Sequence, residues 1–349
     1  MHIGLLYDTI RNGYCSESEV GKMRVAYRKQ GNTIELIRIW SFSEVVEVPE
    51  NIDGCPVTSI ASYAFSSHKW EKDEDVLIYE EACENGSFRQ EAPLRCGGNV
   101  KEVHLPPTVR AIGNYAFYGC INMEVFHGTD RIVRMGSGVF TGCRLSQVWI
   151  NFYEGEKSCL KEILTDIRYG ITATLVYGNE KIRIVFPEYY ADAVENTPAR
   201  IVETHYYGSG GDYRECFYRR ELDFAKYDET FALSAARDQG EVTACVALGR
   251  LMYPYRLREK AERIYHVYVK EHMTQIMGYC LEYLEENREL SVGEPMEIIE
   301  FCCRKALVSE ESLEYGIERA AQSGQTELLS ILMDERQKRF PKKKKEFIL

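Results

Sequence analysis

The chain has 349 residues, a formal net charge of −11 at pH 7 and 12 cysteines. This length is enough for about two domains with ordered cores. The acidic balance argues against nucleic-acid partners, because such binding depends on many Lys and Arg side chains that neutralise phosphates.

The chain begins without the basic start and apolar run of a signal peptide, and no stretch has the apolar length of a membrane span. We therefore expect a cytoplasmic protein that binds no membrane and keeps its cysteines reduced.

A first stretch, residues 32–65, is rich in β-branched and aromatic residues, with a cluster of turn-forming residues at 49–54. This composition predicts short strands joined by tight turns. Residues from about 66 to 95 are strongly charged, which predicts an insertion that loops out on one face or a degenerate repeat.

Three stretches resemble one another: SIASYAFSSH at 59–68, AIGNYAFYGC at 111–120 and RMGSGVFTGC at 134–143. Phe117 and Phe140 are 23 positions apart, as are Cys120 and Cys143. A period kept by two residue types indicates a solenoid, in which small units bury their apolar faces by stacking. The recurring side chains should then form ladders inside it: Phe65, Phe117, Phe140, Cys96, Cys120 and Cys143.

The segments between these stretches have the L-x-x-L-x-L spacing of a leucine-rich strand, as in Val100, Val103 and Leu105. The units therefore resemble leucine-rich repeats of the BspA type. In one copy the residues that match the pattern are Pro106, Ile112, Gly113, Ala116, Phe117, Gly119 and Cys120. The resemblance covers about the first 150 residues and implies a β-rich solenoid. Proteins of this type are often exported surface proteins, so a surface adhesin is one alternative.

The next segment, residues 158–215, is expected to be a connector. It starts with a short helix at 158–167 and continues with two β-rich runs around Gly178 and Asn179, which is typical of a β-hairpin. A Tyr-rich stretch follows, with a Gly-Ser-Gly-Gly sequence near residue 210 that we expect to be flexible.

From residue 216 to 340, apolar residues recur at helical spacing and predict helical hairpins. The last of them, with Ala320, Ala321 and a turn at Gly324, resembles an ankyrin-type helix pair. Residues 341–349 form a basic tail, which we interpret as a solvated charged end.

The predicted fold class is therefore α+β. A leucine-rich solenoid over residues 1–157 is followed by the connector and by an all-α, ankyrin-like domain.

The sequence contains no recognisable catalytic constellation. Neither a Gly-x-Ser-x-Gly turn nor a His-Glu-x-x-His helix is present, and the cysteines lack the clustering of zinc ligands. We expect a protein that is not an enzyme and that needs no cofactor or metal. An alternative is an enzyme or nucleotide-dependent regulator with a site around residues 205–218, where Gly, Tyr, Arg and Asp converge.

The solenoid supplies a candidate binding surface. If Val103 and Leu105 point inward, alternation along the strands places a row of other side chains outward. The predicted binding residues are Glu47, Glu102, His104, His127, Gln147 and Trp149. Two alternatives are a cover formed by the C-terminal half or the charged insertion, and a metal pair of His104 and His127, which lacks a full ligand set.

Tryptophan and histidine offer an apolar body with a polar handle, as interface anchors do. We therefore predict a bacterial, non-enzymatic scaffold that binds a protein partner through its repeat surface. The identity of the partner and the oligomeric state do not follow from the sequence.

Overall fold

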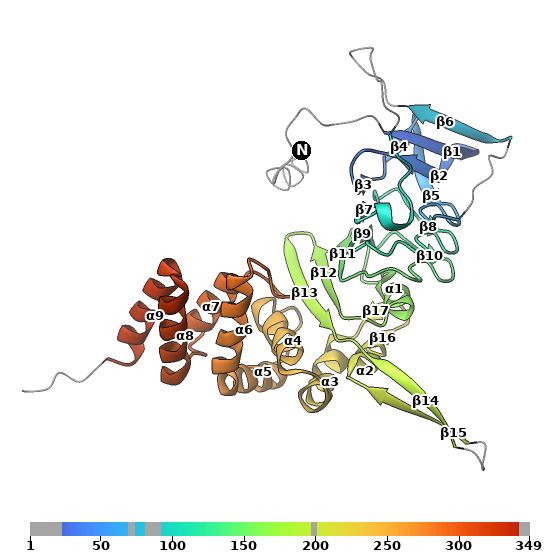
Figure 1. The fold of residues 1–349 in the computed structure, drawn as a ribbon. Coiled ribbons are helices and arrows are strands. Elements are labelled where there is room, and N and C mark those ends of the chain that lie inside the picture. Colours follow the sequence, from blue (N-terminus) through green and yellow to red (C-terminus); the bar gives the residue numbers. More distant parts are fainter. Residues whose placement is uncertain (1–22, 69–73, 81–91, 197–200, 342–349) are drawn as a thin grey trace, which may run out of the picture. The chain divides into compact units, whose positions relative to one another are not determined.

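The computed structural model describes residues 23–68, 74–80, 92–196 and 201–341, without the side chains of residues 193–206. The chain divides into two compact units. The first comprises residues 1–123 with 135–143, and the second comprises residues 124–134 with 144–349. The fold class is α+β, with strands before residue 223 and mainly helices after it (Figure 1).

The strands are β1 (Arg24–Gln30), β2 (Thr33–Trp40), β3 (Val45–Glu47), β4 (Asn51–Ile52), β5 (Cys55–Ile60), β6 (Val76–Glu80), β7 (Glu102–His104), β8 (Ala111–Ile112), β9 (Val125–Thr129), β10 (Arg134–Met135), β11 (Gln147–Phe152), β12 (Ile171–Tyr177), β13 (Glu180–Phe186), β14 (Tyr190–Asn196), β15 (Ile201–Tyr207), β16 (Phe217–Tyr218) and β17 (Glu221–Leu222). The helices are η1 (Gly97–Asn99), α1 (Leu160–Asp166), α2 (Gly210–Arg214), α3 (Phe224–Arg237), α4 (Gly240–Met252), α5 (Glu259–Glu271), α6 (Met273–Glu285), α7 (Pro295–Arg304), α8 (Glu310–Ser323) and α9 (Thr326–Arg339).

The first unit starts with an antiparallel hairpin of β1 and β2, joined at Gly31, whose φ of +64° suits glycine. β2 then pairs in parallel with β5, and β5 pairs in parallel with β8. A separate parallel pair is formed by β3 and β7. Parallel strands that follow one another along the chain are the arrangement expected of a solenoid.

Part of the charged segment at 66–95 differs from the expected looped-out insertion. Residues 76–80 form β6, which pairs antiparallel with β1. The reason is apolar alternation within the charges, because Val76 is buried with Ala26 and Ile37 while Ile78 packs against that cluster. Residues 69–73 and 81–91 of this segment lie outside the described residues.

The phenylalanines of the predicted ladder are stacked in the core of the first unit. Phe65, Phe117 and Phe140 have no exposed surface. The ring centroids of Phe65 and Phe117 are 4.8 Å apart, and those of Phe117 and Phe140 are 5.1 Å apart, with interplanar angles of 19° and 11°. The repeat period thus places one ring above the next in successive turns.

The second unit contains four neighbouring strands of a sheet, in the order β13, β12, β11, β9. β9, β11 and β12 pair in parallel, and β13 returns antiparallel after a turn at Gly178. Val148, Ala173 and Ile184 lie in one cross-strand row and are all buried. The hairpin expected in a connector is therefore present, but it extends the sheet of the solenoid strands β9 and β11.

Two further hairpins follow, β14 with β15 and β16 with β17. Neither hairpin was predicted from the sequence, and the first lies in the Tyr-rich stretch. At its open end the rings of Tyr190 and Tyr207 are stacked, with centroids 4.5 Å apart.

The helical part begins at α3, where the Asp223 carboxylate caps the helix by accepting a hydrogen bond from the backbone N–H of Lys226. α8 starts with a capping box of Ser309 and Ser312 and ends at Gly324 in the left-handed conformation, so α8 and α9 form a tight hairpin. Within the described residues, no helix combines the length and apolar character required to cross a membrane.

A buried ion pair lies in the core of the helical part. Arg250 of α4 is fully buried and donates through Nε and Nη2 to the Asp228 carboxylate of α3, at 2.7 and 3.1 Å. The Tyr265 hydroxyl of α5 donates to the same carboxylate at 2.9 Å. Burial alone lowers the pKa of Arg250, but the hydrogen bonds and charge of Asp228 raise it above its ordinary value. The three helices are therefore tied together around one carboxylate.

Candidate recognition surfaces

In the first unit, the parallel register of β3 and β7 places Glu47 beside His104 and Val45 beside Glu102. Glu47 is exposed, and Glu102 and His104 are half-buried. Nε2 of His104 lies 2.5 Å from Oε1 of Glu102, two residues earlier on the same face of the strand. The three predicted residues therefore share one surface with a mixed acidic and imidazole character.

In the second unit, the register of β9 and β11 places His127 beside Trp149 and Val125 beside Gln147. The imidazole and indole rings are stacked, with centroids 5.4 Å apart and an interplanar angle of 17°. Gln147 is exposed, whereas His127 and Trp149 are half-buried. The structure thus brings together the three predicted residues of this unit on adjacent strands.

Lys181 of β13 completes this surface and was not predicted. Its Nζ lies 4.7 Å from the centroid of the Trp149 ring, a cation–π distance. Burial lowers the pKa of Lys181, and the charge of Arg183 lowers it further. We call His127, Trp149 and Lys181 the Trp149 platform. Lys181 could have been found from the sequence only with the strand order known, because β12 separates it from β11.

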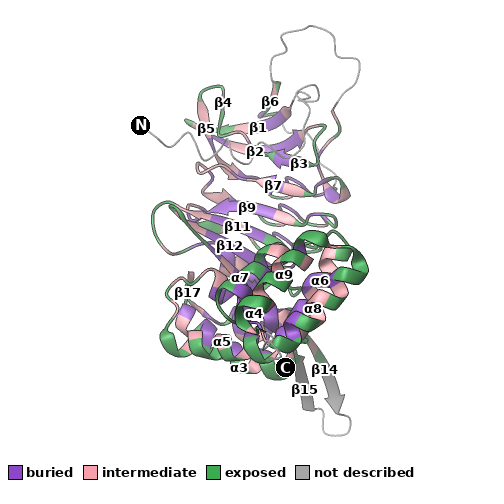
Figure 2. Cartoon of the chain, turned by 90° about the vertical axis from the view of Figure 1, so that its left-hand side faces the viewer, coloured by how far each residue is buried: buried purple, intermediate pink, exposed green. Residues whose placement is uncertain are grey.

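The same face of the sheet is buried farther along. Thr172, Thr174 and Val185, which continue the outward rows onto β12 and β13, are buried. α4 packs on β13, where a Cβ at Gly249 would lie 3.1 Å from the Arg183 carbonyl oxygen. The expected alternative of a covered face therefore applies to part of β12 and β13, while Gln147 and Trp149 on β11 keep exposed surface. Figure 2 shows these strands coloured by burial.

The cysteines of the predicted ladder are structural thiols. Cys120 and Cys143 are buried, and their Sγ atoms donate to the backbone carbonyls of Phe65 and Phe117 at 3.2 and 3.1 Å. Cys96 is half-buried, and burial raises its pKa. The pKa of Cys120 is raised by its contact with Cys143 and by burial. Because a thiol must ionise to act as a nucleophile, these environments favour a packing role.

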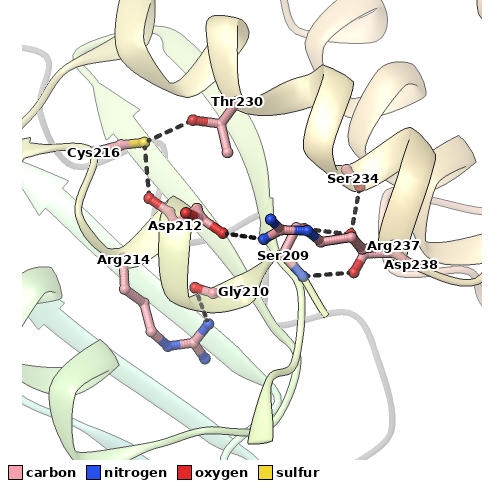
Figure 3. Close-up of polar contacts among 9 residues, drawn as sticks. All are labelled: Ser209, Gly210, Asp212, Arg214, Cys216, Thr230, Ser234, Arg237 and Asp238. Carbon is pink, nitrogen blue, oxygen red and sulfur yellow. Dashed lines mark hydrogen bonds and ion pairs between the residues drawn. The ribbon is translucent and has the colours of Figure 1, made fainter. Parts of the chain in front are cut away.

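The Gly-Ser-Gly-Gly stretch near residue 210 is packed, so the expectation of a flexible linker is wrong. The Asp238 carboxylate accepts a hydrogen bond from the backbone N–H of Ser209 at 2.8 Å and from the hydroxyl of Ser234 at 2.6 Å (Figure 3). It is also bonded by the Ser209 hydroxyl. Ser209 and Ser234 have no exposed surface. One carboxylate at the end of α3 therefore fixes the loop that precedes α2.

Two further features hold α2 in place. A Cβ at Gly210 would lie 2.1 Å from the Pro187 carbonyl oxygen, so only glycine fits. Arg214 is buried, and burial lowers its pKa to about 10. Its guanidinium donates to five backbone carbonyls, those of Leu164, Ile167, Tyr169, Pro187 and Gly210. Such a site organises the backbone around it.

The polar residues of the alternative site around 205–218 bond to other parts of the fold, chiefly to α3 and to backbone carbonyls. The Sγ of Cys216 is 3.4 Å from the Asp212 carbonyl and 3.5 Å from the Thr230 hydroxyl, and burial raises the pKa of the thiol to about 11 (Figure 3). Arg237 pairs with Asp212 at 3.0 Å. The side chain of His205, which belongs to this predicted site, lies outside the described residues.

Residues 90–167 match the family model described as BspA type leucine rich repeat region, which has six copies. This match agrees with the parallel pair of β9 and β11 and with the ladder of Phe117 and Phe140. The search of curated proteins and the search of solved structures found no significant match.

Proposed function

We propose that the protein is a non-enzymatic scaffold that binds a protein partner through the outward face of its repeat strands. One observation carries the proposal. Gln147, His127 and Trp149 keep exposed surface on β9 and β11, while Thr172, Thr174 and Val185, which continue the same face on β12 and β13, are buried. A partner can therefore reach a defined part of the sheet.

The platform is suited to this task because its side chains are already ordered. His127 stacks on Trp149 from β9, and Lys181 reaches the same ring from β13 on the other side of β11. A partner that docks there loses less side-chain entropy than it would on a mobile surface. An indole beside an exposed amide and a cation also offers both the apolar area and the hydrogen bonds of an interface anchor.

The proposal is tested by affinity capture from the lysate of the native cell with three forms of the full chain. The first form is the wild type and the second is Gln147→Glu, which places a charge on the face without removing a core contact. The third form is Gln337→Glu, an identical change at an exposed position of α9. Bound proteins are quantified by mass spectrometry.

We expect at least one partner that the wild type and Gln337→Glu capture equally and that Gln147→Glu loses by about tenfold, because a buried unpaired charge opposes association. A partner list that is the same for all three forms contradicts recognition through this face.

Finer parts of the proposal rest on the sequence resemblance and on the packing of α8 against α9. We propose that the helical hairpins are ankyrin-like and that the protein acts in the cytoplasm of a bacterium. Recovery of the native protein from the cell surface would contradict this location and favour an adhesin.

A further inference from the structure

A second surface lies on the helical part, far along the chain from the repeat strands. An open groove of about 740 Å³ runs between α6 and α8. Its lining consists of Thr274, Gln275, Gly278, Tyr279, Glu282, Glu285, Glu286, Tyr315 and Arg319. The α6 residues recur at helical spacing, so they form one face of that helix.

Glycine and tyrosine shape the middle of the groove. A Cβ at Gly278 would be 3.4 Å from the Tyr315 hydroxyl, so the ring of Tyr315 on α8 lies close over this glycine of α6. Tyr279 and Tyr315 are both half-buried and present aromatic surface from the two helices. Tyrosine rings of this kind accept a guanidinium by stacking and by cation–π attraction.

The end of the groove at the C-terminus of α6 is acidic. Glu282, Glu285 and Glu286 are exposed, and Arg319 is the cation of the lining. Arg319 pairs with Glu285 at 3.0 Å, and Glu286 pairs with Arg288 at 2.5 Å. Within the part of the chain that the structure describes, no cation lies within ion-pair distance of the Glu282 carboxylate.

Without a bound cation, two electrostatic features of this acidic end are unfavourable for α6. Glu282 and Glu286 are four positions apart, a spacing at which like charges repel. They also lie at the C-terminus of α6, where the helix dipole is negative and where the last turn carries no basic residue. A bound cation would relieve both effects, and the net charge of −11 would attract it from a distance.

We propose that this groove binds a basic peptide segment of a partner protein, with an arginine side chain between Tyr279 and Tyr315 and its guanidinium paired with Glu282. Arginine fits better than lysine because its planar guanidinium can stack on a ring and pair with a carboxylate at once. The ion pair of Arg319 with Glu285 in the same groove shows that such pairing suits its geometry. This surface is separate from the repeat face and does not depend on the function proposed for it.

The test uses fluorescently labelled peptides of alternating residues, (Arg-Ala)4, (Lys-Ala)4 and (Glu-Ala)4, and measures anisotropy with the full chain at low salt. We expect binding of the arginine peptide, binding of the lysine peptide weaker by about threefold or more, and none of the glutamate peptide. Equal binding of the two basic peptides, or no binding of either, would overturn the proposal.

The matched variants are Glu282→Gln/Glu286→Gln in the groove and Glu229→Gln/Glu300→Gln at exposed helical positions outside it. Both pairs remove two charges. We expect the groove variant to bind the arginine peptide about tenfold more weakly and the control to stay within about twofold of the wild type. An equal loss in both variants would mean attraction to overall charge and would contradict a site.

A third variant, Tyr279→Leu, keeps the charge of the groove and removes one ring. We expect it to bring the affinities for the arginine and lysine peptides closer together, because the stacking contribution is lost. An arginine preference that is unchanged in this variant would remove Tyr279 from the site.

Discussion

Arg250 and Asp228 show how single residues hold the helical part together. Both side chains are buried, and the carboxylate accepts hydrogen bonds from Arg250 and from Tyr265. A buried ion pair is not a large net source of stability, but removal of one partner leaves the other charge without compensation. Variants that break the pair should therefore lower the free energy of unfolding.

We predict that Asp228→Asn lowers the free energy of unfolding by about 3–5 kcal/mol. The change keeps the size of the side chain and removes its charge, so the buried guanidinium of Arg250 loses its counter-ion. Urea unfolding measures the effect. Asp212→Asn is the control, because its partner Arg237 and Asp212 are exposed, and such pairs contribute less than about 1 kcal/mol. Equal effects of the two substitutions would contradict this reading.

The two neighbouring glycines of α2 give a second prediction at this scale. Gly210→Ala should lower the free energy of unfolding by about 1–3 kcal/mol, because the new Cβ would collide with the Pro187 carbonyl. At Gly211 a Cβ would meet Tyr189 at 3.6 Å, an ordinary contact, so Gly211→Ala should be neutral or stabilising. Thermal unfolding followed by circular dichroism compares the two. A destabilised Gly211→Ala with an unaffected Gly210→Ala would refute the packing described for this loop.

At the scale of elements, the ladder is the feature that joins successive repeats of the first unit. Phe117 lies between Phe65 and Phe140 and has no exposed surface. We predict that Phe117→Ala lowers the free energy of unfolding by about 3–5 kcal/mol, because it leaves a cavity and breaks both stacks. Its neighbour Tyr118 is 46% exposed, so Tyr118→Ala should cost less than about 1 kcal/mol. Denaturant unfolding measures the free energy of unfolding of both variants, and equal losses would contradict the role of the ladder.

The repeat elements could be predicted because the residues of a ladder keep one period along the chain. β6 could not, because its short run of alternating apolar residues lies in a charged stretch outside the repeat period, and its pairing with β1 places Ile78 beside Ala26 from far along the chain. The packing of the Gly-Ser-Gly-Gly stretch could not be predicted for a related reason. Its composition is that of a linker, and the carboxylate that anchors it, Asp238, lies 29 residues from Ser209.

In the candidate site, too, contacts set by the repeat period could be predicted, and contacts between segments far apart in the chain could not. The pairing of His127 with Trp149 follows from the repeat period, so the sequence predicted it. The approach of Lys181 to Trp149 depends on the order of β11, β12 and β13, and the groove depends on the packing of α6 against α8. Neither arrangement has a local signature.

At the scale of the whole molecule, the buried thiols make stability depend on pH. Burial raises the pKa of Cys159 and Cys245 to about 12, and that of Cys216 and Cys303 to about 11. An unfolded thiol ionises near pH 8.5. Between these values the unfolded chain binds fewer protons than the folded one, so stability falls as pH rises.

We predict that the free energy of unfolding is steady below about pH 8 and falls between pH 9 and 11 by up to about 1.4 kcal/mol per pH unit for each such thiol. Urea titrations at a series of pH values measure it. Replacement of Cys216 by Ala should reduce the slope above pH 9, because one thiol no longer contributes. Stability that rises over this range would contradict the burial of these groups.

The central claim is that a partner docks on the outward face at β11. The most direct test places a photo-crosslinking amino acid at Gln147 and, as a control, at Gln337 in the full chain, and illuminates the native cell extract. We predict that position 147 captures a defined partner and position 337 does not, and that Trp149→Ala in the same chain reduces the yield at 147. Capture of the same proteins at both positions, or a yield at 147 that does not depend on Trp149, would contradict the claim.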